Sequence, residues 1–438
     1  MSPARASRLI PYVVACALFM ENLDSTVIAT ALPVIADAFG ESPLRLSLAI
    51  TSYLLSLAVF IPLSGWMADR FGTRRVFASA IGLFTLGSLL CGMCRDVRLL
   101  IACRILQGCG GAMMVPVGRL TLVETFDKSE LMRAMSFVAI PALIGPMLGP
   151  IAGGLIVTYL HWRVIFFLNI PVGLFGLLMV HLHLPDYRAQ RTPPLDIVGL
   201  ILFGSGIGLL SYVLEVFGEH TLSAGEIVGL LAVSLSLIAG YWLHAKRMDF
   251  PLLQLGLLRI RTFGTTVAGS FFTRVGIGGV PFLLPLLYQV GLGFTPVQSG
   301  LLIIPQAAAS MIVKLALPSM ITTLGYRGVL ISNTLAMGLL VLLFATVGLH
   351  TPVWVIVLLG FLFGAFTSVQ FTSMNTLTYA DIAEEKTSNA SSIASTVQQM
   401  AMSFGVASAG LAAAFFIPAG FRSNPEQMIH GTHQSFVA

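Results

Sequence analysis

Long apolar runs, separated by short polar or basic segments, fill the chain from Leu9 to Phe416. A helix needs about 20 apolar residues to cross the hydrocarbon core of a bilayer, so windows of that length mark candidate spans. Thirteen such windows lie near residues 10–34, 46–68, 76–94, 99–118, 133–158, 163–182, 196–217, 225–244, 263–290, 298–319, 327–348, 353–377 and 389–416. The pattern predicts an all-α polytopic membrane protein.

Composition supports this fold class. Of the 438 residues, 56% are hydrophobic and 10% are charged, whereas about a quarter of an ordinary soluble domain is charged. In a soluble chain the net charge of +5 would suggest a nucleic-acid partner. In a membrane protein, however, basic residues mainly mark the cytoplasmic loops. We therefore predict the lipid bilayer as a partner and no nucleic acid.

The distribution of arginine and lysine predicts the orientation. Basic residues gather in the amino terminus and in alternate loops. The opposite loops hold only Arg45, Arg95, Arg98, Arg163 and Arg422. Because cytoplasmic loops are rich in arginine and lysine, we predict a multi-pass protein with a cytoplasmic amino terminus. The first apolar run continues beyond its polar positions, which favours a retained helix over a cleaved signal peptide.

Two basic connectors that contain proline, residues 183–196 and 244–261, divide the chain. They isolate the seventh and eighth spans, which have almost no internal charge. We predict a six-helix bundle in residues 1–185, connectors with two inserted helices in residues 186–258, and a carboxyl-terminal bundle in residues 259–438.

The two bundles resemble each other as a weak internal repeat. The ends of the second and tenth spans align Phe71, Gly72 and Arg74 with Leu324, Gly325 and Arg327. The fourth and twelfth spans align Gly108 with Gly364. Repeated halves around a midplane site are the architecture of secondary transporters.

Glu21 and Asp24 interrupt the first span near its middle. A carboxylate at the bilayer centre is costly, so it usually faces a protein interior or a water-filled cavity and marks function. Residues three apart share a helix face, which predicts that both side chains point the same way. Arg104 in the fourth span needs a carboxylate partner or a wet cavity for the same reason. The alternative is a structural ion pair or hydrogen bond that only fixes helix packing.

The segment GWMADRFGTRR predicts a tight turn after the second span. Gly65 would let the helix end pack closely, and Gly72 would permit the turn. Asp69 would accept hydrogen bonds or meet a helix N-terminus. Arg70 and Arg74 would hold the loop on the cytoplasmic side.

Glycine recurs every fourth residue in the fifth span, at Gly145, Gly149 and Gly153. This spacing gives one flat face on which another helix can pack closely. Pro146 and Pro150 alternate with the glycines, remove backbone donors and bend the helix. The span is therefore predicted to be both closely packed and bent.

These motifs resemble signatures of the major facilitator superfamily, over nearly the whole chain. GWMADRFGTRR is similar to the loop between its second and third helices, and PALIGPMLGPIAGG to the signature of its drug:proton antiporters. LDSTVIATALP, from Leu23 to Pro33, resembles the first-helix signature of the fourteen-helix branch. That branch has one span more than the chain predicts, so we expect either a truncated chain or a carboxyl terminus outside the cell. A missing last helix would leave the second bundle one helix short.

The resemblance implies a role for each buried charge in the family's fold of two rocking bundles. Arg104 would couple proton binding to transport with Asp24 as the proton site, and Glu21 would either share in proton binding or read the charge of the substrate. Such transporters need no cofactor, and we expect a monomer in the cell's inner membrane.

Polar residues in the apolar spans predict a substrate cavity. Arg274 lies deep in the ninth span, whereas Lys314 is close enough to a helix end to snorkel. We expect Arg274, Gln107, Gln370 and Asn375 to face the cavity.

The sequence thus predicts a proton-coupled exporter of small molecules, such as drugs, that works by alternating access. Acidic residues in the cavity would favour lipophilic cations. Arg104 and Arg274 balance Glu21 and Asp24, however, so an exporter of an organic anion such as a carboxylate metabolite is the alternative. A non-transporting membrane sensor is a remote alternative.

An enzyme and a metal site are not expected. No loop is long enough for a catalytic domain, and HExxH, P-loop and nucleophile-elbow motifs are missing from the sequence. Cys91 and Cys94 form a lone CxxC without the second pair or histidines of a metal site.

Overall fold

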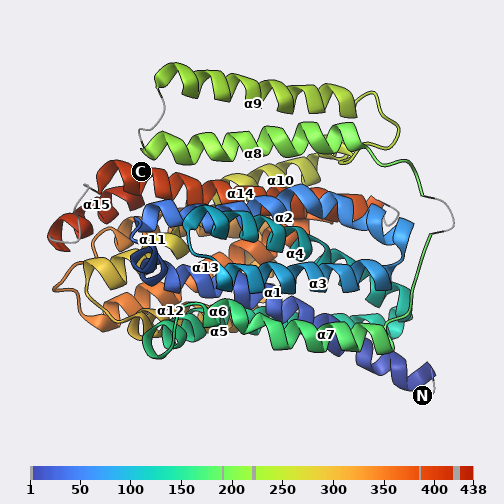
Figure 1. The fold of residues 1–438 in the computed structure, drawn as a ribbon, viewed down its shortest axis with the longest axis horizontal. Helices are drawn as coiled ribbons and strands as arrows, with labels where there is room; N and C mark the ends of the chain where they lie inside the picture. The colour runs from blue at the N-terminus through green and yellow to red at the C-terminus, as the bar shows by residue number, and fades with distance from the viewer. Residues whose placement is uncertain (1–2, 190–191, 220–222, 384–385, 418–424, 438) are drawn as a thin grey trace.

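The computed structural model describes residues 3–189, 192–219, 223–383, 386–417 and 425–437, and these residues form an all-α protein. Most of the long helices run side by side (Figure 1). The N-terminus lies at the right-hand end of the bundle in this view. We call that end the near end and the opposite end the far end.

The elements follow one another in two sets with a helix pair between them. The first set is α1 (Pro3–Phe39), α2 (Pro43–Phe71), α3 (Thr73–Met93), α4 (Val97–Thr125), α5 (Lys128–Tyr159), α6 (Val164–Phe167) and α7 (Asn169–His183). The pair is α8 (Ile197–Glu219) and α9 (Ala224–Ala245). The second set is η1 (Leu255–Arg259), α10 (Arg261–Gly278), α11 (Val280–Leu286), η2 (Leu287–Gly291), α12 (Pro296–Phe344), α13 (Val353–Thr378), α14 (Thr387–Phe416) and α15 (Pro425–Val437).

Every predicted span coincides with one or more of these helices. Among the described residues, 11 helices are long and apolar enough to cross a membrane. The number is below thirteen because α12 contains both the tenth and the eleventh predicted span. In addition, the apolar part described for α5, Ile144–Tyr159, is shorter than a full span.

Two turns at the near end depend on glycine. Gly72 joins α2 to α3 with φ of 94°, and Gly325 breaks α12 into two segments with φ of 66°. Glycine adopts such positive φ values at little cost, because it has no Cβ. The two residues are those that the internal repeat aligns, so the structure confirms this part of the repeat.

Equivalent helices also pack in the same way in both halves. A Cβ at Gly108 of α4 would lie 2.6 Å from the Cβ of Ser56 on α2. A Cβ at Gly364 of α13 would collide with the carbonyl oxygen of Gln306 on α12. The second aligned pair of glycines therefore serves the same close helix approach in each half.

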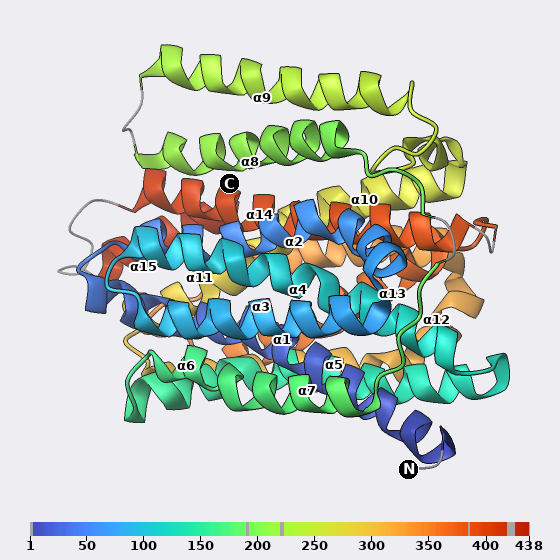
Figure 2. The same ribbon diagram turned by 45° about the vertical axis from the view of Figure 1, so that its right-hand side comes forward.

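Helices α8 and α9 lie outside the two sets, at the top of Figures 1 and 2, and α8 packs against α14 and α2. The carboxylate of Asp196, just before α8, accepts hydrogen bonds from the backbone N–H groups of Gly199 and Leu252 and lies 2.7 Å from Nε2 of His244. Burial raises the pKa of Asp196, but these hydrogen bonds lower it by more, so the pKa is below its ordinary value. The unit boundaries at residues 185 and 258 stay a prediction.

Helix α15 has no counterpart among the predicted spans. It packs against α14, α12 and η2, and its Met428 is fully buried. Nε2 of His433 lies 2.8 Å from the carbonyl oxygen of Val347, and the rings of Phe436 and Phe344 stack. A helix of 13 residues is too short to be recognised as a span.

Candidate functional site

A buried ionic network lies between α1, α4 and α7. Nη1 of Arg104 is 2.5 Å from Oδ2 of Asp24, and the two residues are 0% and 3% exposed. Oδ1 of Asp24 accepts hydrogen bonds from Gln107 Nε2 at 3.0 Å and from Asn169 Nδ2 at 2.7 Å. The guanidinium also donates from Nε to the carbonyl oxygen of Ala49. Asp24 is thus the carboxylate partner that Arg104 needs.

Asn169 is the member of this network that the sequence does not predict. It begins α7, is 2% exposed, and also donates to Oγ of Ser88 at 3.0 Å. The only signal in the sequence is one amide side chain at the edge of an apolar run. That signal does not reveal a contact with Asp24, which lies 145 positions away.

Glu21 and Asp24 face different surroundings. Glu21 lines a cavity between the two helix sets, whereas Asp24 points toward α4 and α7. Residues three apart are separated by about 60° around a helix axis, which is enough to divide them at the edge of a bundle. The expectation of a shared direction is therefore wrong. Within the described residues, Glu21 forms no ion pair.

The cavity has a volume of about 630 Å³. Central portions of α1, α2, α5, α10, α11, α12, α13 and α14 line it, so both helix sets contribute. Glu21 comes from the first set, and Arg274 and Lys314 come from the second. The cavity wall thus carries an acidic side chain on one side and basic side chains on the other.

Arg274 is 9% exposed and faces this cavity. Its Nε donates to Oγ of Ser270 at 3.2 Å, and its guanidinium carbon lies 3.7 Å from the ring centroid of Phe371. In the described part of the chain, no carboxylate lies within ion-pair distance of Arg274. Its positive charge is therefore available to a bound molecule.

Of the remaining residues predicted for the substrate cavity, Asn375 lines it. Gln107 is instead fully buried in the ionic network. Gln370 is also fully buried, and its Oε1 accepts a hydrogen bond from Asn333 of α12 at 2.8 Å. The prediction that these two glutamines face the cavity is wrong, because each forms hydrogen bonds with a neighbouring helix of its own bundle.

The glycine stripe of α5 packs against α1. A Cβ added at Gly145, Gly149 or Gly153 would press on neighbouring atoms of α1. These atoms belong to Phe19, Asn22, Leu23, Thr26 and Val27. Pro146 and Pro150 line the cavity on the same helix. The motif therefore holds α5 beside the segment of α1 that carries both acidic residues.

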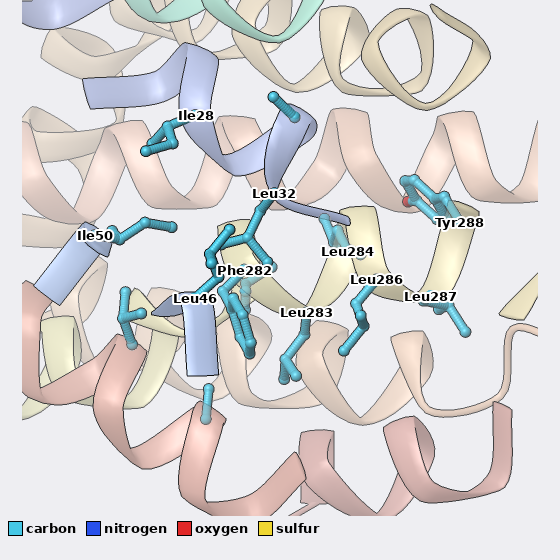
Figure 3. Packing of buried hydrophobic residues seen from close by; sticks show 14 of the residues in the cluster. Ile28, Leu32, Leu46, Ile50, Phe282, Leu283, Leu284, Leu286, Leu287 and Tyr288 are labelled. Atoms are coloured by element: carbon cyan, nitrogen blue, oxygen red, sulfur yellow. The ribbon is translucent and has the colours of Figure 1, made fainter. Parts of the chain in front are cut away.

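The two helix sets touch each other in the far half of the molecule. Gly154 of α5 lies against the carbonyl oxygen of Pro296, and Gly300 of α12 lies against that of Pro150, so neither glycine has room for a Cβ. Figure 3 shows apolar side chains of α1 and α2 pointing toward those of α11 in a continuous cluster. These contacts separate the cavity from the far end.

At the near end, the connector after α7 holds the turn between α2 and α3. Oδ1 of Asp186 accepts a hydrogen bond from the backbone N–H of Arg74 at 3.2 Å, and the carboxylate occupies the space beside Gly72. Of the two roles expected for Asp69, meeting a helix N-terminus falls to Asp186 at α3. Nothing lies within 4 Å of a Cβ added at Gly65, so the expected close packing there is wrong.

Comparisons with known proteins agree with this arrangement. Residues 14–406 match the Major Facilitator Superfamily. Proteins named "Putative multidrug resistance protein MdtD" from Shigella sonnei (strain Ss046) and Serratia proteamaculans (strain 568) are each 43% identical to this chain. The alignments cover 92% and 91% of this chain and 86% and 84% of those proteins.

Solved structures show the same fold at low sequence identity. A D-xylose-proton symporter has a TM-score of 0.69 at 15% identity, covering 100% of this chain and 96% of the symporter. The nucleoside transporter NupG has a TM-score of 0.67 at 12% identity, covering 99% of this chain and 96% of the transporter. At these identities the likeness concerns the fold alone.

Proposed function

The chain belongs to the Major Facilitator Superfamily, and from this premise we propose that it is a proton-coupled exporter of small molecules of the multidrug efflux type. The observation that carries the proposal is the buried Asp24–Arg104 pair beside a central cavity. Ligand pockets for drug-sized molecules typically have volumes of about 300–1,000 Å³. The names of the relatives support a role in drug resistance.

Protonation of Asp24 is the proposed coupling step. In a low-dielectric interior, a charged pair attracts strongly, and a proton on Asp24 would remove the negative charge that holds Arg104. A ligand shifts a conformational equilibrium only through its different affinity for the two states. The proton would bind Asp24 more tightly in a conformation that lacks the Asp24–Arg104 contact than in one that has it. This difference in affinity would couple proton binding to the conformational change.

The orientation of the exporter follows from its loops. With a cytoplasmic amino terminus, the near end faces the cytoplasm and the closed far end faces the outside. The described conformation would then be an inward-facing one, in which substrate enters the cavity from the cytoplasm. Opening of the α5–α12 contact at the far end would release the substrate outside.

We expect purified protein in proteoliposomes to move ethidium, a lipophilic cation, when a pH gradient is imposed. Ethidium fluorescence and a pH-sensitive dye inside the vesicles measure the two fluxes. A protonophore should stop ethidium transport, because it removes the driving force. Ethidium transport that continues unchanged after the gradient collapses would contradict proton coupling.

Arg274 supports a second candidate, export of an organic anion. Its guanidinium faces the cavity, is supported by Ser270 and Phe371, and has no carboxylate partner in the described chain. A carboxylate substrate would pair with it through charge-assisted hydrogen bonds. Lys314 lines the same cavity and adds a second positive charge.

Replacing Arg274 by alanine distinguishes the two candidates. Hydrogen bonds to charged groups contribute about 1.5–3 kcal/mol, so transport of a dicarboxylate such as succinate should fall about 10- to 100-fold in the anion exporter. Ethidium transport should change by less than about twofold, and Arg274→Lys should keep part of the succinate transport. Equal losses of succinate and ethidium transport in Arg274→Ala would instead mean that Arg274 has a structural role. If the wild-type protein does not move succinate, the anion candidate is excluded.

A further inference from the structure

Tyr53 of α2 lies between the cavity and the ionic network. Its side chain lines the cavity, although the residue is 1% exposed. The guanidinium carbon of Arg104 lies 4.2 Å from the ring centroid, a cation–π contact. Tyr53 therefore contacts the network and borders the space into which Glu21 points.

Two polar atoms at this contact have no hydrogen-bond partner among the described residues: the Tyr53 hydroxyl and Nη2 of Arg104. Buried polar groups are nearly always hydrogen-bonded, and ordered water serves where no protein group does. The hydroxyl packs beside Gly111, where a Cβ would lie 3.0 Å from the hydroxyl oxygen. The two unpaired atoms would be satisfied by a small polar molecule such as water.

Three ionisable side chains act on the Tyr53 hydroxyl. Glu21 and Asp24 from α1 and Arg104 from α4 act on it electrostatically, and Arg119 of α4 acts on Glu21. Arg104 also interacts electrostatically with Cys91 of α3. Helix α14 packs against α2, and its described residues, Thr387–Phe416, include no ionisable side chain.

We propose that Tyr53 relays protons between Glu21 in the cavity and Asp24 in the buried pair, with water bound at its hydroxyl and at Nη2 of Arg104. Glu21 takes a proton from the cavity. The Tyr53 hydroxyl then accepts this proton through the water while it donates its own proton toward Asp24. Glu21 ends as a carboxylate, Asp24 ends protonated, and Tyr53 is unchanged. The inference rests on the proposed proton-coupled function.

Tyr53→Phe tests the relay, because it removes the hydroxyl and keeps the ring on Arg104. Two rates are measured in proteoliposomes: ethidium efflux driven by a pH gradient, and ethidium counterflow without a gradient. Since general acid–base groups contribute about 10²- to 10⁴-fold to proton transfer, efflux should fall at least about 10-fold. Counterflow, which needs no net proton movement, should change by less than about twofold.

Tyr212→Phe, which removes a hydroxyl from the exposed surface of α8, is the matched control and should leave both rates unchanged. Unaltered efflux in Tyr53→Phe would overturn the relay. Parallel loss of efflux and counterflow would also overturn it, because packing alone would then explain the residue. Wild-type protein with counterflow but no gradient-driven efflux would instead overturn the proposed proton coupling.

Discussion

Asp24→Asn is expected to abolish ethidium efflux driven by a pH gradient, with a loss of at least about 100-fold. The amide cannot be protonated in the working pH range, so the proposed switch on Arg104 is lost. The substitution also leaves Arg104 buried without its partner, and breaking a buried pair on one side costs about 3–5 kcal/mol. Efflux in proteoliposomes and thermal unfolding of the purified protein measure the two effects.

Asp24→Asn combined with Arg104→Gln separates stability from coupling. The double variant has no unpaired buried charge, so its thermal stability should recover toward that of the wild type. Its gradient-driven efflux should stay lost, because neither the proton site nor its counter-ion remains. Full gradient-driven efflux in Asp24→Asn alone would show that Asp24 is not the proton site.

Gly154→Leu should have the second largest effect, through the contact between α5 and α12. Gly154 lies directly against the backbone of Pro296 and Val297, so a leucine would hold the far ends apart. Overpacking typically costs about 1–3 kcal/mol. The conformation in which α5 and α12 touch at the far end would therefore become about 5- to 150-fold less populated relative to the conformation in which they are apart. Pulsed electron paramagnetic resonance between spin labels on the far ends of α5 and α12 should report a longer distance, and transport should slow accordingly.

Gly338→Leu is the control for this experiment, because nothing lies within 4 Å of a Cβ at Gly338 on α12. It should leave both the label distance and ethidium transport as in the wild type. If Gly154→Leu left the distance distribution unaltered, the α5–α12 contact would not be the closure of the far end.

The places of the helices along the chain follow from the sequence alone, because a span needs a long apolar run whatever surrounds it. The two glycine turns at Gly72 and Gly325 and the close contacts of the α5 stripe follow from it as well. These features depend on backbone geometry and on the missing Cβ, which are local properties of the chain. Arg104 was likewise recognisable, because a buried guanidinium must have a partner.

Which side chains meet could be learned only from the folded molecule. A rotation of about 60° along one helix sends Glu21 into the cavity and Asp24 into the bundle, and the sequence does not fix where the bundle's edge falls. Asn169 reaches Asp24 from a helix far along the chain, and Asp186 takes the place expected for Asp69. Such contacts depend on how separate helices pack together, and helix packing is a property of the whole fold.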